Sequence, residues 1–296
     1  MEIKYLNIDF KPLIKKLEIG LQREYTTEAF SSSWKSVFRG RGLEFDSYRT
    51  YVPTDDAKEI DWKASLRSNE LLIRVLTEER NVNVFIMMDV SNSMIFTSTE
   101  KLKCEYAAEI SATIAYAALG AGDSVGLCMF TDKISKLVPS NIGRKQFYMI
   151  SRALANPKLY GGNYDLNMAI TNALNLLSRG TIVFIVSDFI GLPEDWEDLL
   201  GTMTRKFEVI GIMVQDPRDV VLPPKSGQYV LSDPFSDHDI LVDPSALREV
   251  YEELSRKRNE EIQNAFKKKG ASFMAIHTDE NYVFPLIKLM MQRVSQ

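Results

Sequence analysis

The chain has 296 residues, of which 36 are Lys or Arg and 40 are Asp or Glu, so its formal net charge is −4. Hydrophobic residues make up 45% of the chain and aromatic residues 10%, a composition that excludes a disordered chain and is ordinary for a globular protein. The slight excess of acidic residues speaks against a nucleic-acid partner, because nucleic-acid binders are usually basic on at least one face.

The two cysteines, Cys104 and Cys128, each lie in an apolar run, which excludes a disulfide framework and favours two small buried side chains in a reducing compartment. The first twenty residues have neither the apolar core nor the small-residue cleavage site of a signal peptide. No uncharged apolar run reaches the roughly 18–20 residues that a membrane-spanning helix needs. We therefore expect a soluble, cytoplasmic protein without a transmembrane segment.

Residues 1–80 are predicted to form a smaller N-terminal lobe packed on the main domain, because their apolar content is too thin for a core of their own. A short amphipathic helix is expected near residues 11–20, and strand-like pieces near residues 43–51 and 71–76. The lobe is therefore expected to depend on its contact with the rest of the chain.

An acidic group within this lobe, followed by a tryptophan, has two interpretations. The favoured one is a capped turn and a short helix whose Trp62 docks the lobe onto the sheet, since Asp is a common helix-capping residue. The alternative is a contact surface for a partner. The acidic residues are Asp55, Asp56, Glu59 and Asp61.

The main domain is predicted to span residues 81–296 and to be an α/β fold with a mostly parallel sheet flanked by helices. Short runs that are apolar throughout alternate there with helical patterns, which is typical of strands covered on both faces. The expected strands are 82–90, 124–130, 134–138, 181–187, 207–214 and 271–277, with the second and third forming a hairpin. The expected helices are 101–120, 144–155, 166–178, 194–205, 244–269 and one at the C-terminus.

Two segments near the C-terminus differ from this alternation. Residues 216–243 are rich in proline and are predicted to be a looping insertion with a β-ribbon. The run at 249–269 carries charges of both signs, which favours a solvent-exposed helix face stabilised by pairs of opposite charge four residues apart.

Polar side chains follow two of the expected strands. Asp89, Ser91 and Ser93 come after the first strand, and Asp188 follows the strand at 181–187. Ligands collect at the carboxyl ends of parallel strands, and two carboxylates that meet there repel each other unless a cation binds. If the two strands are neighbours, the sequence predicts a divalent-cation site at these four residues, with Mg²⁺ favoured and Mn²⁺ or Ca²⁺ as alternatives. Asp89 and the serines taken alone are more typical of a helix N-cap than of a metal site.

The pattern Asp89-x-Ser91-x-Ser93 with Asp188 resembles the metal-ion-dependent adhesion site of von Willebrand factor type A domains. The rest of the chain is similar to the bacterial family called domain of unknown function 58, whose members carry a von Willebrand A-like fold. The segments that carry this second resemblance are Gly40-Arg41-Gly42-Leu43-Glu44-Phe45, Pro53-Thr54-Asp55-Asp56, Ile60-Asp61-Trp62-Lys63 and Asp216-Pro217-Arg218-Asp219.

One loop departs from the adhesion-site pattern. Such domains usually offer a Thr shortly after a Gly-Gly pair, but Gly161-Gly162 is followed here by Asn163, Tyr164 and Asp165. Asn163 and Asp165 are the candidates for the missing oxygen, directly or through water.

The expected function is that of a non-enzymatic protein–protein interaction module, because the sequence has no nucleotide-binding glycine loop and no nucleophile elbow. The resemblance implies an adaptor in which the metal ion binds an acidic side chain of a partner. It also implies the partner, a MoxR-type AAA+ ATPase or its client, since genes for this family commonly accompany genes for such ATPases. The alternatives are a metal-dependent phosphoesterase that uses the same cation and a metal-free structural scaffold, which the missing Thr favours.

Overall fold

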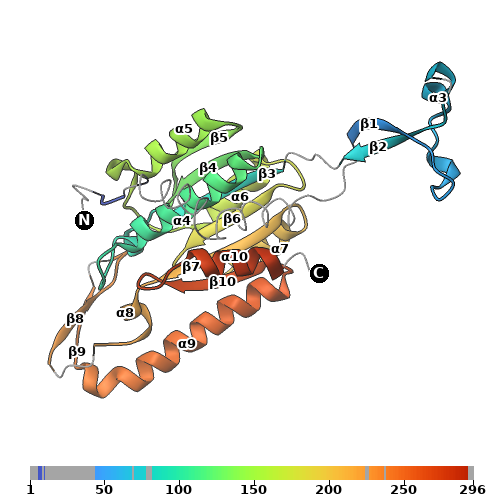
Figure 1. The fold of residues 1–296 in the computed structure, drawn as a ribbon. Coiled ribbons are helices and arrows are strands. Elements are labelled where there is room, and N and C mark those ends of the chain that lie inside the picture. Colours follow the sequence, from blue (N-terminus) through green and yellow to red (C-terminus); the bar gives the residue numbers. More distant parts are fainter. Residues whose placement is uncertain are drawn as a thin grey trace.

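The computed structural model describes residues 6–8, 10, 44–68, 70–77, 82–223, 227–236 and 238–292. Figure 1 shows these residues in two parts, a larger α/β part and a small unit made of β1, α3 and β2. The helix expected at residues 11–20 lies outside the described residues.

The larger part is built on a six-stranded sheet with the strand order β10-β7-β6-β3-β4-β5. Five strands are parallel, and β5 pairs antiparallel with β4 at one edge, which confirms the predicted hairpin. The central strands are apolar along nearly their whole length because side chains on both of their faces are buried. The strands are β3 (Asn83–Asp89), β4 (Ser124–Phe130), β5 (Ile134–Asn141), β6 (Ile182–Ser187), β7 (Glu208–Gln215) and β10 (Ser272–His277).

Helices cover both faces of the sheet, as Figure 1 shows. They confirm the predicted helices to within a few residues, and the short α8 is an addition that the sequence pattern does not predict because it has only four residues. Their bounds are α4 (Lys103–Gly120), α5 (Arg144–Leu154), α6 (Leu166–Leu176), α7 (Trp196–Thr204), α8 (Pro217–Val220), α9 (Pro244–Lys268) and α10 (Val283–Gln292). Among the described residues no helix is long and apolar enough to cross a membrane.

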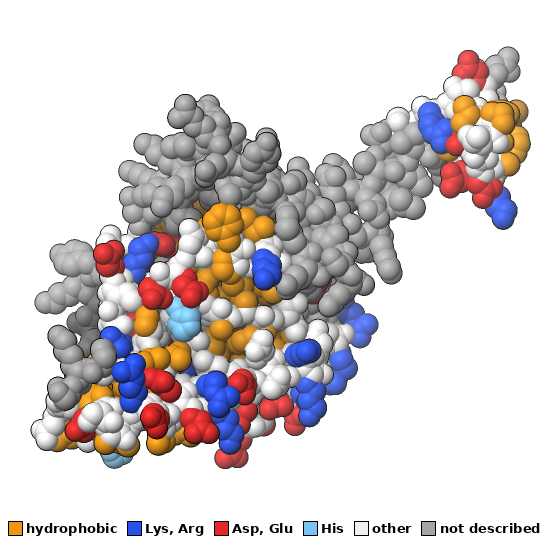
Figure 2. Space-filling view, turned by 60° about the horizontal axis from the view of Figure 1, so that its bottom comes forward, with side chains coloured by type: hydrophobic (Ala, Val, Ile, Leu, Met, Phe, Trp, Pro, Cys, Tyr) orange, Lys and Arg blue, Asp and Glu red, His pale blue; other side chains and the backbone are white. Residues whose placement is uncertain are grey.

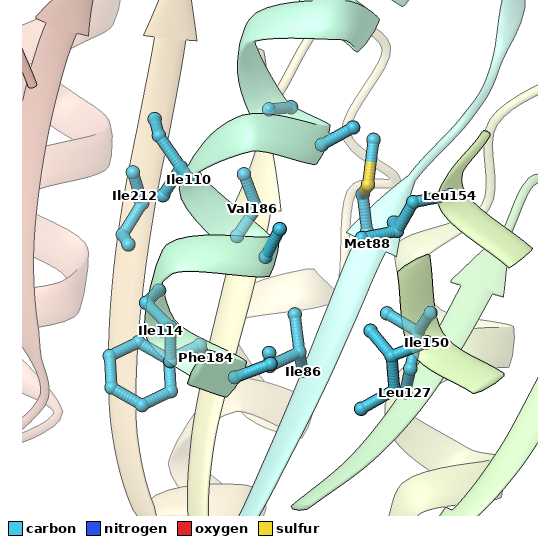
Figure 3. Packing of buried hydrophobic residues seen from close by; sticks show 14 of the residues in the cluster. Ile86, Met88, Ile110, Ile114, Leu127, Ile150, Leu154, Phe184, Val186 and Ile212 are labelled. Carbon is cyan, nitrogen blue, oxygen red and sulfur yellow. The ribbon is translucent and has the colours of Figure 1, made fainter. Parts of the chain in front are cut away.

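The alternation of side chains along β3 divides the core into two layers. Ile86 and Met88 point into the layer that α4, α5 and α10 complete, where Figure 3 shows them together with Ile114 of α4 and Ile150 of α5. Phe85 and Met87 point to the opposite face, which α6, α7 and α9 cover. Both cysteines are buried and unbonded, as the sequence predicts. The sheet is therefore rigidly packed on both sides, and its strand ends are held in fixed positions.

In the small unit, β1 (Glu44–Thr50) pairs antiparallel with β2 (Leu72–Thr77), and α3 (Trp62–Ser68) lies between them in sequence. Asp61 begins α3 by accepting hydrogen bonds from the backbone N–H groups of Lys63 and Ala64, so the predicted capped helix is confirmed. Trp62 is 62% exposed, and the expectation that it docks the lobe onto the sheet is wrong. Figure 2 shows hydrophobic side chains on the outer surface of this unit.

Part of the N-terminal segment does lie against the larger part. Leu6, Ile8 and Phe10 pack against the core layer that contains α4. The remaining stretch of residues 1–80 before β1 lies outside the described residues, so the packing of the whole lobe stays a prediction.

Within the segment at 216–243, β8 (Tyr229–Ser232) pairs antiparallel with β9 (Asp239–Val242) to form a two-stranded ribbon. The ribbon leads into α9, whose exposed face carries charges of both signs (Figure 2). The predicted pairs four residues apart are present there, at Arg248–Glu252, Arg256–Glu260 and Lys257–Glu261.

Candidate functional site

The predicted site residues meet at the carboxyl edge of the sheet because β3 and β6 are neighbours. Met88 pairs with Val186 in the parallel register, so the residues that follow both strands emerge side by side. Ser93 Oγ donates a hydrogen bond of 3.1 Å to Asp188 Oδ1, and Ser91 Oγ lies 3.2 Å from Ser93 Oγ. The four predicted residues are at most 3% exposed; they are Asp89, Ser91, Ser93 and Asp188.

Tight turns after the strands hold both carboxylates in place. Asp89 Oδ1 accepts from the backbone N–H of Ser91 at 2.8 Å, and Asp188 Oδ1 accepts from that of Ile190 at 3.0 Å. Phe189, between them in the second turn, has a φ of 54°, the one positive φ outside glycine among the described residues. Such strain persists only where the surroundings fix it, and the buried Phe189 ring packs against Phe266 at a centroid distance of 5.5 Å.

Ser187 is a site residue that the sequence analysis missed. As the last residue of β6 it is completely buried, and its hydroxyl donates to Asp89 Oδ2 at 2.7 Å. Ser187 Oγ also accepts a hydrogen bond from the backbone N–H of Phe189 at 2.9 Å. Ser187 therefore connects the Asp89 carboxylate to the strained turn that carries Asp188. Its position at the end of an apolar run, directly after the β-branched Ile185 and Val186, is the signal that points to it.

The loop after the Gly-Gly pair brings an aromatic side chain to the site. The Tyr164 hydroxyl lies 3.4 Å from Ser187 Oγ, and its ring stacks on Phe235. Burial, with Asp89 nearby, raises the pKa of Tyr164 well above its ordinary value. Asn163 is exposed, and Asp165 caps α6 by accepting from the backbone N–H of Met168, so Asp165 is already engaged in a structural role.

Lys103 is the second residue that the sequence analysis missed. It is the first residue of α4 and only 1% exposed, yet its ammonium group reaches two carboxylates. Lys103 Nζ donates to Asp188 Oδ2 at 2.8 Å and to Asp219 Oδ2 at 2.9 Å. Burial by itself lowers the pKa of Lys103, but the two carboxylates outweigh it and leave that pKa above its ordinary value. The site therefore contains a fixed positive charge.

A third strand end supplies Asp219. The turn after β7 forms a reciprocal cap in which Asp219 Oδ2 also accepts from the backbone N–H of Asp216 at 2.9 Å. The Asp216 carboxylate accepts in turn from the backbone N–H and the hydroxyl of Ser98, in the loop after β3. The segment Asp216-Pro217-Arg218-Asp219, which carries part of the family resemblance, thus ties β7 to the loop after β3.

The two central carboxylates have different surroundings. Asp188 is paired with Lys103, whereas Asp89 forms no ion pair with any residue that the structure describes. Burial, and then the nearby charge of Asp188, raise the pKa of Asp89 to about 7. Negative charge at this edge is therefore neutralised on the Asp188 side and incompletely neutralised on the Asp89 side.

The chemistry of the donors suits a hard cation, since carboxylate and hydroxyl oxygens are the ligands of Mg²⁺. The arrangement does not fit a cation bound by all four predicted residues. Both oxygens of Asp188 are engaged, Oδ1 by Ser93 and Oδ2 by the Lys103 ammonium group, and a second positive charge at this carboxylate would be repelled by the first. Within the described ranges, no three acidic, His or Cys side chains are grouped to hold a metal ion.

Solved structures resemble the larger part of the chain. The conserved hypothetical protein BatB from Bacteroides thetaiotaomicron matches with a TM-score of 0.51 and 14% identity, over 73% of this chain and 100% of that one. A von Willebrand factor type A protein from Catenulispora acidiphila matches with a TM-score of 0.44 and 12% identity, over 75% and 45% of the two chains. The predicted fold class, an α/β fold with a mostly parallel sheet flanked by helices, is confirmed.

Relatives of known sequence match parts of the chain of different length. An uncharacterized protein of Mycobacterium tuberculosis is 28% identical over 258 residues, which are 86% of this chain and 80% of that protein. The uncharacterized protein YeaD of Bacillus subtilis is 29% identical over 109 residues, 37% of this chain and 25% of that protein. The family model described as protein of unknown function DUF58 matches residues 47–261. Because this match covers well over half of the chain, the protein belongs to the DUF58 family, as its motifs predict.

Proposed function

We propose that this protein is a non-enzymatic interaction module that binds a protein partner through the loops at the carboxyl edge of its sheet. The observation that carries the proposal is the cluster of mutually hydrogen-bonded polar side chains from the ends of β3, β6 and β7. The four predicted residues at its centre are at most 3% exposed, which favours a structural role for their hydroxyl and carboxylate groups. A buried polar network of this kind fixes the shape of the loops that surround it.

The surface above the cluster offers a contact point for a partner. Phe96, in the loop after β3, is 42% exposed, and its ring lies 5.7 Å from Lys103 Nζ. The carbonyl oxygen of Phe96 accepts from the backbone N–H of Lys103, so the network also fixes the backbone of this residue. Aromatic side chains held in one conformation are the residues that most often dominate protein–protein binding energy.

The partner we propose is a MoxR-type AAA+ ATPase or its client, on the basis of the family to which the chain belongs. The test is binding of the purified wild type and of Phe96→Ala to the ATPase encoded nearest to its gene. We expect Phe96→Ala to weaken binding by about tenfold or more, which corresponds to about 1.4 kcal/mol. Asp89→Ala, which removes a carboxylate from the network, is expected to weaken binding as well.

Ile142→Ala is the matched control. Ile142 is also an exposed apolar residue, but it follows β5, and the pairing of Asn141 with Val125 places it at the opposite edge of the sheet. This variant is expected to bind the ATPase like the wild type. If Phe96→Ala and Asp89→Ala also bind like the wild type, the partner does not bind at the carboxyl edge of the sheet. If the wild type does not bind the ATPase, the proposed partner is wrong.

The sequence-based prediction of a divalent cation at Asp89, Ser91, Ser93 and Asp188, with Mg²⁺ favoured, is untested, and calorimetric titration decides between it and a site without metal. The proposal that the protein is not an enzyme has its own test, incubation with a generic phosphate ester in Mg²⁺ or Mn²⁺. We expect no turnover. Metal-dependent turnover that is lost in Asp89→Ala would contradict the interaction module and favour a phosphoesterase.

A further inference from the structure

We propose that Lys103 is the resident cation of this site, taking beside Asp188 the place that the adhesion-site resemblance assigns to a divalent metal ion. The cluster then keeps its shape without metal, and partner docking is independent of Mg²⁺. The inference rests on the proposed function only in placing the docking loops at this edge, and its charge argument concerns the chain alone.

The burial of Lys103 is the first observation that carries it. Lysine is almost never fully buried unless it is paired, and Lys103 is 1% exposed. Its ammonium group satisfies this condition twice, with Asp188 at 2.8 Å and with Asp219 at 2.9 Å. The ammonium group thus holds together carboxylates from the ends of two adjacent strands, β6 and β7. Bridging carboxylates from separate strands is the structural task of a bound cation in such a site.

The position of Lys103 in its helix is the second observation. Lys103 is the first residue of α4, where the helix dipole disfavours positive charge. A lysine there weakens the helix start, so helix stability does not explain it. The carboxylates in front of the helix do explain it, because they supply the negative charge that the ammonium group faces.

The fixed geometry of Asp219 is the third observation. Its Oδ2 accepts both from Lys103 Nζ and from the backbone N–H of Asp216, so the carboxylate is held by its own turn and not by the lysine alone. The Asp219 carboxylate is therefore held in position to bind the Lys103 ammonium group. Removing its charge would leave Asp188 and Asp219 as buried or half-buried carboxylates without a cation, next to the already buried Asp89.

The experiment compares wild type, Lys103→Met and Lys101→Met by thermal unfolding in EDTA and in excess Mg²⁺ or Mn²⁺, with calorimetric titration of the same ions. Methionine keeps the length of the side chain without its charge. Lys101 is the control, since it lies two residues away and its exposed side chain pairs with Glu109 and not with Asp188 or Asp219. We expect the wild type to have the same melting temperature in EDTA as in excess divalent ion, and likewise Lys101→Met. Neither protein is expected to show a heat of metal binding.

Lys103→Met is expected to be less stable than wild type in EDTA and to regain on the order of 5 °C when the divalent ion is present in large excess over its dissociation constant. Saturable Mg²⁺ or Mn²⁺ binding by the wild type, with Lys103 intact, would overturn the inference. So would a folded Lys103→Met that shows no response to either ion.

A second variant covers the case in which Lys103→Met does not fold. In Lys103→Met/Asp188→Asn the buried pair is replaced by neutral groups of similar size, and we expect this variant to fold in EDTA without a response to metal. If it too fails to fold, charge compensation is not the role of Lys103. Binding to the ATPase is a separate test: a wild type whose stability does not depend on Mg²⁺ but that never binds the ATPase would refute the proposed partner and leave this inference standing.

Discussion

The hydroxyl of Ser187 links the two halves of the site. It donates to the Asp89 carboxylate and accepts from the backbone N–H of Phe189, so its loss would remove both hydrogen bonds and leave the buried N–H of Phe189 without this acceptor. We expect Ser187→Ala to lower the free energy of unfolding by about 1–3 kcal/mol, because an unsatisfied buried polar group has that cost. Chemical denaturation followed by circular dichroism measures the change.

Ser111→Ala is the control for this prediction. Ser111 lies in α4 and is equally buried, but its hydroxyl has no hydrogen-bond partner among the residues that the structure describes. Removing an unpaired buried hydroxyl from a helix is expected to be neutral or slightly stabilising, since alanine is the better helix former. If both variants lose the same stability, the loss at Ser187 comes from packing and not from the hydrogen bonds around Asp89.

Residues at the site differ in how far the sequence indicates them. Asp89 and Asp188 could be predicted because each follows an apolar run, and position at a strand end is a local property. Lys103 could not, since a lysine at the start of a helical pattern is ordinarily solvent-exposed. Its burial depends on Asp188 and on Asp219, residues 85 and 116 positions away. Only the folded chain brings these charges together.

At the scale of elements, α9 is held on the sheet by an aromatic contact over a glycine. The ring of Phe266 lies so close to Gly211 in β7 that a Cβ atom added there would be 2.5 Å from it. Phe266 is completely buried and also contacts Phe189 and Trp196, so it has little room to move. We expect Gly211→Ala to destabilise the protein by about 1–3 kcal/mol, the usual cost of overpacking a core. Thermal and urea unfolding measure it.

Gly120 provides the comparison. It ends α4 and is exposed, and an added Cβ would meet no atom within 4 Å. Gly120→Ala is expected to raise stability slightly, by less than about 1 kcal/mol, because alanine lowers the conformational entropy of the unfolded chain. A Gly211→Ala variant as stable as Gly120→Ala would mean that α9 is free to shift away from β7.

The bounds of the helices and strands can be predicted closely from the sequence, whereas the order of the strands in the sheet cannot. The bounds of β4, Ser124–Phe130, coincide with the predicted strand because the apolar run is bounded by polar residues on both sides. The adjacency of β3 and β6, on which the meeting of Asp89 and Asp188 depends, was only a condition of the prediction. Strand order is set by how the helices between the strands cross the sheet, and local periodicity carries no record of it.

At the scale of the whole molecule, the described residues of the small unit take no part in the main hydrophobic core. Neither core layer includes a buried residue between 44 and 77, and the apolar residues of α3, Trp62 and Leu66, are 62% and 82% exposed. By contrast Leu6, Ile8 and Phe10 pack against the layer that contains α4. The two portions of the N-terminal lobe should therefore differ in their effect on the stability of the main domain.

We expect a variant in which a short Gly-Ser linker replaces residues 44–77 to unfold in one cooperative transition within about 4 °C of the wild type, the shift that roughly 1 kcal/mol produces in a domain of this size. The replacement is geometrically mild because Glu44 and Thr77 are paired across β1 and β2 and so lie next to each other. Calorimetry measures the transition. Replacing Leu6, Ile8 and Phe10 by alanine is the contrasting variant and should lower the melting temperature further. If the linker variant instead loses cooperative unfolding, the small unit is part of the main core after all.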